Sequence, residues 1–155
     1  MVAEVDRIDL KILKVLQEDA TKSASEIADI VGLSQSPCWR RIQRLKEMGY
    51  ISRIVAVLNR DKLNLNAQFF IQVKVVKHDK ENLIIFGDAI RNFPEVTECH
   101  VILGAYDFLL RVVAKDIDAY EEFFFERLSK LPGVREVNSC VAVSEIKSTT
   151  SLPIS

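Results

Sequence analysis

The sequence predicts an α+β protein in two parts, three short helices followed by a domain of mixed helices and strands. Three observations support this class. Apolar residues in the first third recur at the spacing of amphipathic helices, a stretch rich in β-branched residues follows, and the remaining two-thirds repeat one strand–helix–strand pattern at a shift of 38 residues. The 155 residues suffice for two small domains. We place them at residues 1–50 and 67–155, joined by a linker strand and hinge at 51–66.

The composition is that of a water-soluble globular protein. Hydrophobic residues make up 48 % of the chain and charged residues 28 %. No apolar run approaches the roughly 18 residues that a membrane-spanning helix needs, and the N-terminus lacks the pattern of a signal peptide. We therefore expect a cytoplasmic protein with no membrane partner.

The cysteines and histidines give no sign of a disulfide framework or a metal site. Cys38, Cys99 and Cys140 are far apart and form no C-x-x-C pair. Neither His78 nor His100 has a partner at ligand spacing. Because all three cysteines fall in apolar patterns, we expect buried free thiols. Because the cysteines and histidines lack ligand spacing, we expect no metal, and we also expect no cofactor.

The first third is predicted to hold three helices. The first spans residues 6–17 with Asp6 as its cap, and the second is capped by Ser23 or Ser25 and ends at Gly32. The third runs from 34 to about 48, with Gly49 as its stop. Three short helices with a glycine-containing turn between the second and third follow the plan of a (winged) helix-turn-helix domain.

The third predicted helix has a surface suited to DNA. Residues 34–60 carry six basic side chains and one acidic side chain, which favours a polyanionic partner. On a helical wheel Cys38, Ile42 and Leu45 form the buried face. Arginine, glutamine and small hydroxyl side chains on the opposite face have the chemistry to read base edges and bind phosphates. The residues predicted to contact double-stranded DNA are Ser34, Gln35, Ser36, Arg40, Gln43 and Arg44, with Arg41 and Arg53 nearer the phosphates.

The remaining chain predicts a doubled β-α-β unit. Residues 50–59 are expected to form the linker strand, and the repeat predicts further strands at 68–76, 96–103, 108–114 and 134–146, with helices at 80–92 and 117–131. This is the ferredoxin-like βαββαβ arrangement, with helices on one face of an antiparallel sheet. Apolar residues occur at both odd and even positions of these strands, so both faces of the sheet carry apolar side chains. The face without helices should therefore be buried against a partner. We expect a homodimer with facing sheets, reinforced by the strand at 54–58.

Several segments, in this order and spacing, resemble the Lrp/AsnC family of transcriptional regulators, the leucine-responsive or feast/famine regulators. They are residues 6–9 (DRID), 31–38 (VGLSQSPC), 40–45 (RRIQRL), 49–51 (GYI), 98–100 (ECH), 104–110 (GAYDFLL) and 131–134 (LPGV). The resemblance implies a transcription regulator, found in the cytoplasm at the nucleoid. It also implies dimers that assemble to octamers, with an amino-acid effector bound between dimers. Ala105 stands where the best-known member has an acidic residue, so the preferred amino acid stays open.

The loop at 104–107 joins the two β-α-β copies and is the predicted effector site. Gly104 and Ala105 expose backbone N–H groups for a carboxylate, Asp107 supplies a charge for an ammonium group, and Tyr106 walls a pocket. The weaker predicted contacts are Glu98, His100, Ser139 and Val141. The alternative is a plain hairpin turn in which Asp107 bonds to its own backbone.

Two other functions remain open on the sequence alone. A tetrapyrrole-acting enzyme on the same fold would use His100, but the sequence has no nucleophile–base pair and no glycine-rich phosphate loop. An amino-acid-binding module without DNA function would not need the surface at 34–44. We therefore predict a regulator and not an enzyme.

Overall fold

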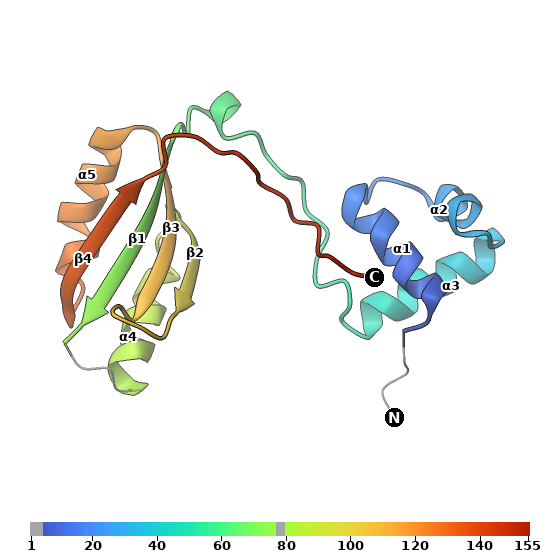
Figure 1. The fold of residues 1–155 in the computed structure, drawn as a ribbon, viewed down its shortest axis with the longest axis horizontal. Helices are drawn as coiled ribbons and strands as arrows, with labels where there is room; N and C mark the ends of the chain where they lie inside the picture. Colours follow the sequence, from blue (N-terminus) through green and yellow to red (C-terminus); the bar gives the residue numbers. More distant parts are fainter. Residues whose placement is uncertain (1–4, 77–79) are drawn as a thin grey trace. The chain divides into compact units, whose positions relative to one another are not determined.

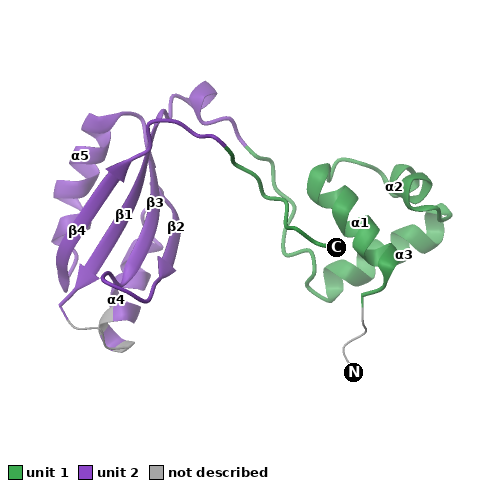
Figure 2. Cartoon of the chain, viewed as in Figure 1, with its two compact units in different colours: residues 1–57, 147–155 green, residues 58–146 purple. Residues whose placement is uncertain are grey.

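The structure is a computed structural model that describes residues 5–76 and 80–155. The chain divides into two compact units, one of residues 1–57 with 147–155 and one of residues 58–146 (Figure 2). The sequence prediction assigned residues 147–155 to the second domain. In the structure the Gln17 side chain bonds both the N–H and the C=O of Leu152, at 2.9 and 3.1 Å, which ties this segment to the first unit. His78 lies outside the described residues.

The first unit is a three-helix bundle of α1 (Arg7–Glu18), α2 (Ala24–Val31) and α3 (Gln35–Glu47). Asp6 and Ser23 each form a capping box at the start of α1 and α2, so Ser23 and not Ser25 is the cap of α2. Gly32 ends α2 with φ 76°, a left-handed conformation that glycine adopts without a Cβ clash. The helix-turn-helix prediction is confirmed.

One small core holds the three helices together. Each helix contributes the apolar face that its periodicity predicts. The buried residues of this core are Ile12 from α1, Ile27, Ala28 and Val31 from α2, and Cys38, Ile42 and Leu45 from α3.

The second unit is a four-stranded antiparallel sheet with two helices. Its elements are a short 3₁₀ turn η1 (Asp61–Leu63), β1 (Ala67–Val75), α4 (Lys80–Ile90), β2 (Val96–Val101), β3 (Phe108–Ala114), α5 (Ile117–Glu126), a second 3₁₀ turn η2 (Leu128–Lys130) and β4 (Val134–Val141). The strand order is β2-β3-β1-β4, and both helices cover one face of the sheet (Figure 1). The ferredoxin-like α+β prediction is confirmed.

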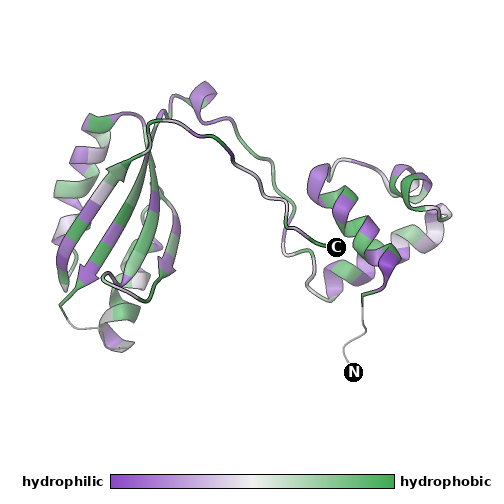
Figure 3. Cartoon of the chain, viewed as in Figure 1, coloured by the Kyte–Doolittle hydropathy of each residue, from purple (hydrophilic) through white to green (hydrophobic). Residues whose placement is uncertain are grey.

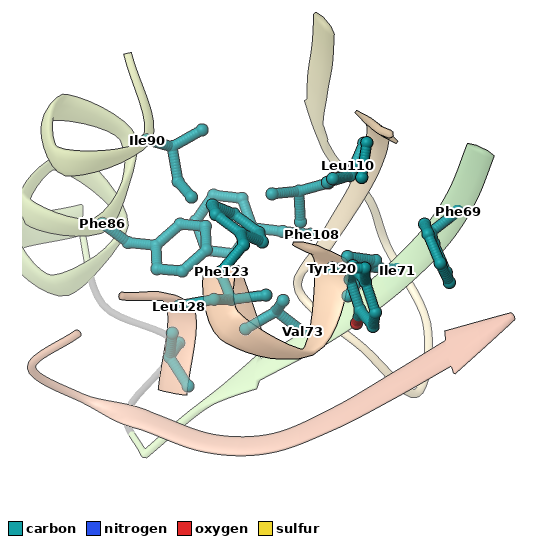
Figure 4. Packing of buried hydrophobic residues seen from close by; sticks show 13 residues of the cluster. Phe69, Ile71, Val73, Phe86, Ile90, Phe108, Leu110, Tyr120, Phe123 and Leu128 are labelled. Atoms are coloured by element: carbon teal, nitrogen blue, oxygen red, sulfur yellow. The ribbon is translucent and has the colours of Figure 1, made fainter. Parts of the chain in front are cut away.

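The core of this unit lies between that face and the helices. Alternate residues of β1 and β3 point into it, and aromatic rings from α4 and α5 pack on them (Figure 4). The Phe69 and Tyr120 rings stack with centroids 3.8 Å apart, and the Phe86 and Phe108 rings lie at 4.2 Å. Hydrophobic and hydrophilic residues follow one another along β1 and β4 (Figure 3).

The predicted strand at 50–59 is wrong for the single chain. Residues 53–59, all described, lie outside any helix or strand, and Ile54, Val55, Val57 and Leu58 are exposed. Their β-branched pattern favours an extended backbone, but a strand also needs a ladder partner, and the chain provides none there.

Two further expectations need correction. The predicted last strand, 134–146, ends at Val141, and the predicted helix 117–131 breaks at Arg127 (φ −131°) into α5 and a 3₁₀ turn. Only Cys38 is buried. Cys140 is exposed because it is in register with Phe70 on the uncovered face of the sheet, and Cys99 is exposed on the edge strand β2.

Candidate nucleic-acid interface and effector site

Helix α3 presents a polar face opposite its buried one. Ser34, Gln35, Ser36 and Arg40 are exposed and Gln43 is half-buried. Ser34 is the N-cap residue but forms no side-chain cap bond, so the helix start does not use its hydroxyl. Burial raises the pKa of Cys38 on the opposite face, which keeps this thiol neutral in the core.

The guanidinium groups of Arg41 and Arg44 do not belong to that polar face. The helical wheel had placed Arg44 on it. Arg41 donates to Asp6 at 2.6 Å and to Asp9 at 2.8 Å, and Arg44 donates to the other oxygen of Asp9. The wheel gives only the direction in which a side chain leaves the helix. A long arginine can bend back to a buried carboxylate on α1, and Asp9 is 0 % exposed.

The charges of this cluster support one another. The N–H of Asp9, followed by the Arg41 guanidinium, lowers the pKa of the Asp6 carboxyl. The Asp9 carboxylate, followed by that of Asp6, raises the pKa of Arg41. Asp6 and Arg41 therefore each favour the charged form of the other.

Asp107 sits at the base of the predicted effector loop and is 8 % exposed. Its Oδ2 accepts a 2.7 Å hydrogen bond from the N–H of Val75, and its own N–H donates to the carbonyl of Val73. The carboxylate therefore binds the end of the neighbouring strand β1. This differs from the hairpin-turn alternative, in which Asp107 would bond to the backbone of its own turn.

The other loop residues are more open. Gly104 and Ala105 are exposed, and Tyr106 donates from its hydroxyl to Glu136 at 2.8 Å. This bond to Glu136 raises the pKa of Tyr106. The loop thus exposes Gly104 and Ala105 beside a tyrosine whose hydroxyl is bonded to Glu136 of β4.

The four weaker effector candidates split between the two faces of the sheet. Glu98 pairs in register with Arg111 and His100 with Leu109, on the uncovered face, where Glu98 also lies 3.5 Å from His100 and 2.9 Å from Arg111. Ser139 and Val141 are in register with Ile71 and Phe69, whose side chains enter the core.

Ser139 contacts the Tyr120 hydroxyl of α5, and burial raises the pKa of this tyrosine. Side chains on opposite faces of a sheet cannot line one pocket. The structure therefore does not bring the two pairs together.

A separate open groove of about 540 Å³ lies between α4 and β2. Its lining includes Leu83, Gly87, Arg91 and Cys99, and also Glu98, but none of residues 104–107. Among the residues that the structure describes, no three side chains gather in a way that suits a metal ion.

Comparisons with known proteins identify both parts of the chain. A family model described as winged helix-turn-helix DNA-binding matches residues 5–52, and one described as Lrp/AsnC ligand binding domain matches residues 68–152. The chain belongs to the Lrp/AsnC family. The predicted resemblance is thereby confirmed, and the chain is a DNA-binding transcriptional regulator with a C-terminal ligand-binding domain.

Individual Lrp/AsnC relatives match over nearly the full length. The DNA-binding transcriptional activator DecR of Escherichia coli (strain K12) is 37 % identical over 150 residues, 97 % of this chain and 99 % of DecR. A transcriptional regulator from Neisseria meningitidis, solved in complex with L-Met, matches with a TM-score of 0.93 at 36 % identity over 97 % of each chain. An AsnC family regulator from Agrobacterium tumefaciens matches with a TM-score of 0.91 at 44 % identity over 96 % of each chain.

The helices of the described residues are all too short or too polar to span a lipid bilayer.

Trp39 is the residue that sequence reasoning missed in this Lrp/AsnC helix-turn-helix. It is 54 % exposed on α3, at helical spacing from Ser36 and Gln43. An indole left this open on a polar helix face is an uncommon use of apolar surface. The signal was present in the sequence, because position 39 falls one residue before Arg40 and off the Cys38–Ile42–Leu45 face.

Proposed function

We propose that the polar face of α3 enters the major groove of double-stranded DNA and reads its sequence. The observation that carries this is the cluster of exposed Ser34, Gln35, Ser36 and Arg40 on a helix whose other side is anchored in a core. In this division of roles residues 1–50 bind DNA, 51–66 connect, and 67–155 bind effector and assemble. A two-fold dimer would prefer pseudo-palindromic half-sites about 10 bp, or a multiple of that, apart.

Arg40 is the side chain on this face with the reach to bond two acceptors of one guanine. Replacing such a base-reading arginine weakens specific binding by about 1–3 kcal/mol and relaxes the preference at one base pair. The test measures fluorescence anisotropy with a duplex selected by the protein from a random library. Arg40→Ala should lose affinity and selectivity, whereas Arg7→Ala, an exposed arginine on α1, should not. Equal specific binding by wild type and Arg40→Ala would remove Arg40 from the proposal.

Trp39 extends the same surface with an apolar contact, such as that to a thymine methyl group. It is the only tryptophan of the chain, so its emission reports on α3 directly. Addition of the selected duplex should change the intensity or wavelength of that emission. Emission unchanged at saturating DNA would place Trp39 outside the interface.

The proposed effector is an amino acid, bound at the loop of Gly104, Ala105, Tyr106 and Asp107 where dimers meet. The L-Met bound by the regulator from Neisseria meningitidis supports this ligand class. Backbone N–H groups would take the carboxylate, and Tyr106 would wall the pocket. Glu98 and His100 offer polar contacts from the uncovered face, and Ser139 and Val141 would act from behind, through the packing of β4.

A thermal-shift panel of the twenty amino acids tests the effector proposal, since a ligand that binds only the folded state must raise the melting temperature. Tyr106→Phe, which loses the bond to Glu136, should reduce the shift, and Tyr50→Phe serves as the exposed control. No shift with any amino acid would contradict an amino-acid effector for this chain.

We also propose that the protein is a homodimer, which assembles further to an octamer, and works as a cytoplasmic, nucleoid-associated regulator without enzymatic activity. Exposed Ile54, Val57 and Leu58, together with Phe70 on the uncovered sheet face, supply apolar surface for the dimer. Pairing of the 54–58 segments between protomers would provide the ladder partner that the single chain lacks.

A further inference from the structure

The buried carboxylate of Asp9 joins the first helix to the DNA-reading helix. Its Oδ1 accepts from Arg41 at 2.8 Å, and its Oδ2 accepts from Arg44. Arg41 also donates to Asp6 at 2.6 Å. The partners lie 32 and 35 residues away from Asp9 in the sequence, so these bonds are tertiary.

Burial makes this cluster consequential. A carboxylate with 0 % exposure is tolerated in a protein interior only when it is paired and hydrogen-bonded. The loss of Arg44 leaves Asp9 Oδ2 with only the 3.2 Å hydrogen bond from the Asp6 N–H, so the buried charge is compensated less well. Asp9 lies in the first turn of α1, where the helix dipole also favours a negative charge.

The geometry limits what the two arginines can do for DNA. Arg41 is 28 % exposed and bonds two carboxylates, and the Arg44 side chain, although 42 % exposed, bonds Asp9 and has a buried Nε without a hydrogen-bond partner. Arg40, the neighbouring residue on the helix, is exposed. The guanidinium groups of Arg41 and Arg44 are thus both bonded to Asp9 of α1, which limits their freedom to reach a phosphate.

We propose that Asp9 is a positioning residue for DNA recognition. It holds Arg41 and Arg44 against α1, and these arginines set the orientation of α3 and are not phosphate contacts. This inference rests on the proposed DNA-reading role of α3. It assigns a role to Asp9, which contacts no DNA, and replaces the direct role first predicted for Arg41 and Arg44.

The salt dependence of DNA binding separates positioning from phosphate binding. Removal of one charge that neutralises a phosphate changes the slope of log K against log salt by about 0.9, so an arginine contributed twice by a dimer changes it by about 1.8. The variants are Arg44→Gln, Arg41→Gln and Asp9→Asn, with Arg53→Gln, an exposed linker arginine, for comparison. All are measured with the full chain and the library-selected duplex.

We expect Arg44→Gln and Asp9→Asn each to weaken binding by about tenfold or more, because a shifted α3 no longer aligns side chains such as Arg40 with the bases, while the salt slope stays at the wild-type value. The double variant Asp9→Asn/Arg44→Gln should bind DNA with an affinity no lower than that of the single variant that binds less tightly, because both substitutions break the same connection. Arg44→Lys keeps one donor for Asp9 and should recover part of the affinity.

Three results would overturn the inference: a slope change of about 1.8 in Arg44→Gln and Arg41→Gln, additive losses in the double variant, or unchanged affinity in Arg44→Gln. If Asp9→Asn does not fold, the slopes of the two arginine variants still decide. If the wild type binds no duplex, the proposed function fails and not this assignment alone.

Discussion

Removal of the Asp107 carboxylate should destabilise the second unit, because that group holds the end of β1. Asp107→Ala deletes the acceptor of the 2.7 Å bond from the Val75 N–H. Val75 is 4 % exposed and sits at a register shift between β1 and β4, where the regular ladder is interrupted. Water therefore cannot easily replace the missing acceptor.

The magnitude follows from the unsatisfied donor. A buried N–H left without an acceptor costs about 1–3 kcal/mol. With a urea m-value of about 1.5 kcal/mol per M for a small domain, a loss of about 2 kcal/mol lowers the unfolding midpoint by about 1.3 M. Asp107→Asn keeps a carbonyl oxygen for Val75 and should lose less than half as much.

The assay is urea unfolding followed by far-UV circular dichroism at one fixed protomer concentration, because dimerisation would otherwise shift the midpoint. Glu122→Ala, which removes an exposed carboxylate from α5, is the matched control. An Asp107→Ala midpoint within the error of the control would refute the structural role of this carboxylate. The result also decides how to test effector binding, because a variant that unfolds the loop cannot report on its ligand.

Three further predictions follow from other parts of the chain. Gly32→Ala forces a Cβ into a residue with φ 76° and should lower the stability of the first unit by about 1 kcal/mol, measured by thermal unfolding, whereas no loss would mean that the turn relaxes. Light scattering at micromolar concentration should give at least twice the 17.6 kDa of one chain, and a monomer would contradict burial of the uncovered sheet face. Hydrogen bonds from the Thr21 hydroxyl and N–H, and then from Lys22, lower the pKa of Asp19 to about 2. Because this folded-state pKa is depressed, the stability advantage of wild type over Asp19→Asn should be present above about pH 4 and disappear as pH falls through about 2, and a pH-independent difference would contradict it.

Local patterns in the sequence are sufficient to predict the helices, the strands and the family. The amphipathic patterns that contain Ile12, Ile27 and Ile42 each predicted one helix, and Asp6 and Gly32 marked two helix ends. The 38-residue repeat predicted the order of strands and helices in the second unit. These are local properties: a cap bonds N–H groups within three residues, and an amphipathic period is set by neighbours one or two turns away.

The contacts that the sequence did not predict join residues that are distant in the chain. The wheel sent Arg44 outward, but the side chain reaches a carboxylate 35 positions earlier, on another helix. The sequence grouped Ser139 with Glu98 as effector contacts, but the strand register places them on opposite faces of the sheet. The β-branched run at 54–58 favours an extended backbone, yet strand formation requires a partner that the single chain does not supply. In each case local pattern limits the direction of a side chain or backbone, and the contact itself depends on which distant segment packs beside it.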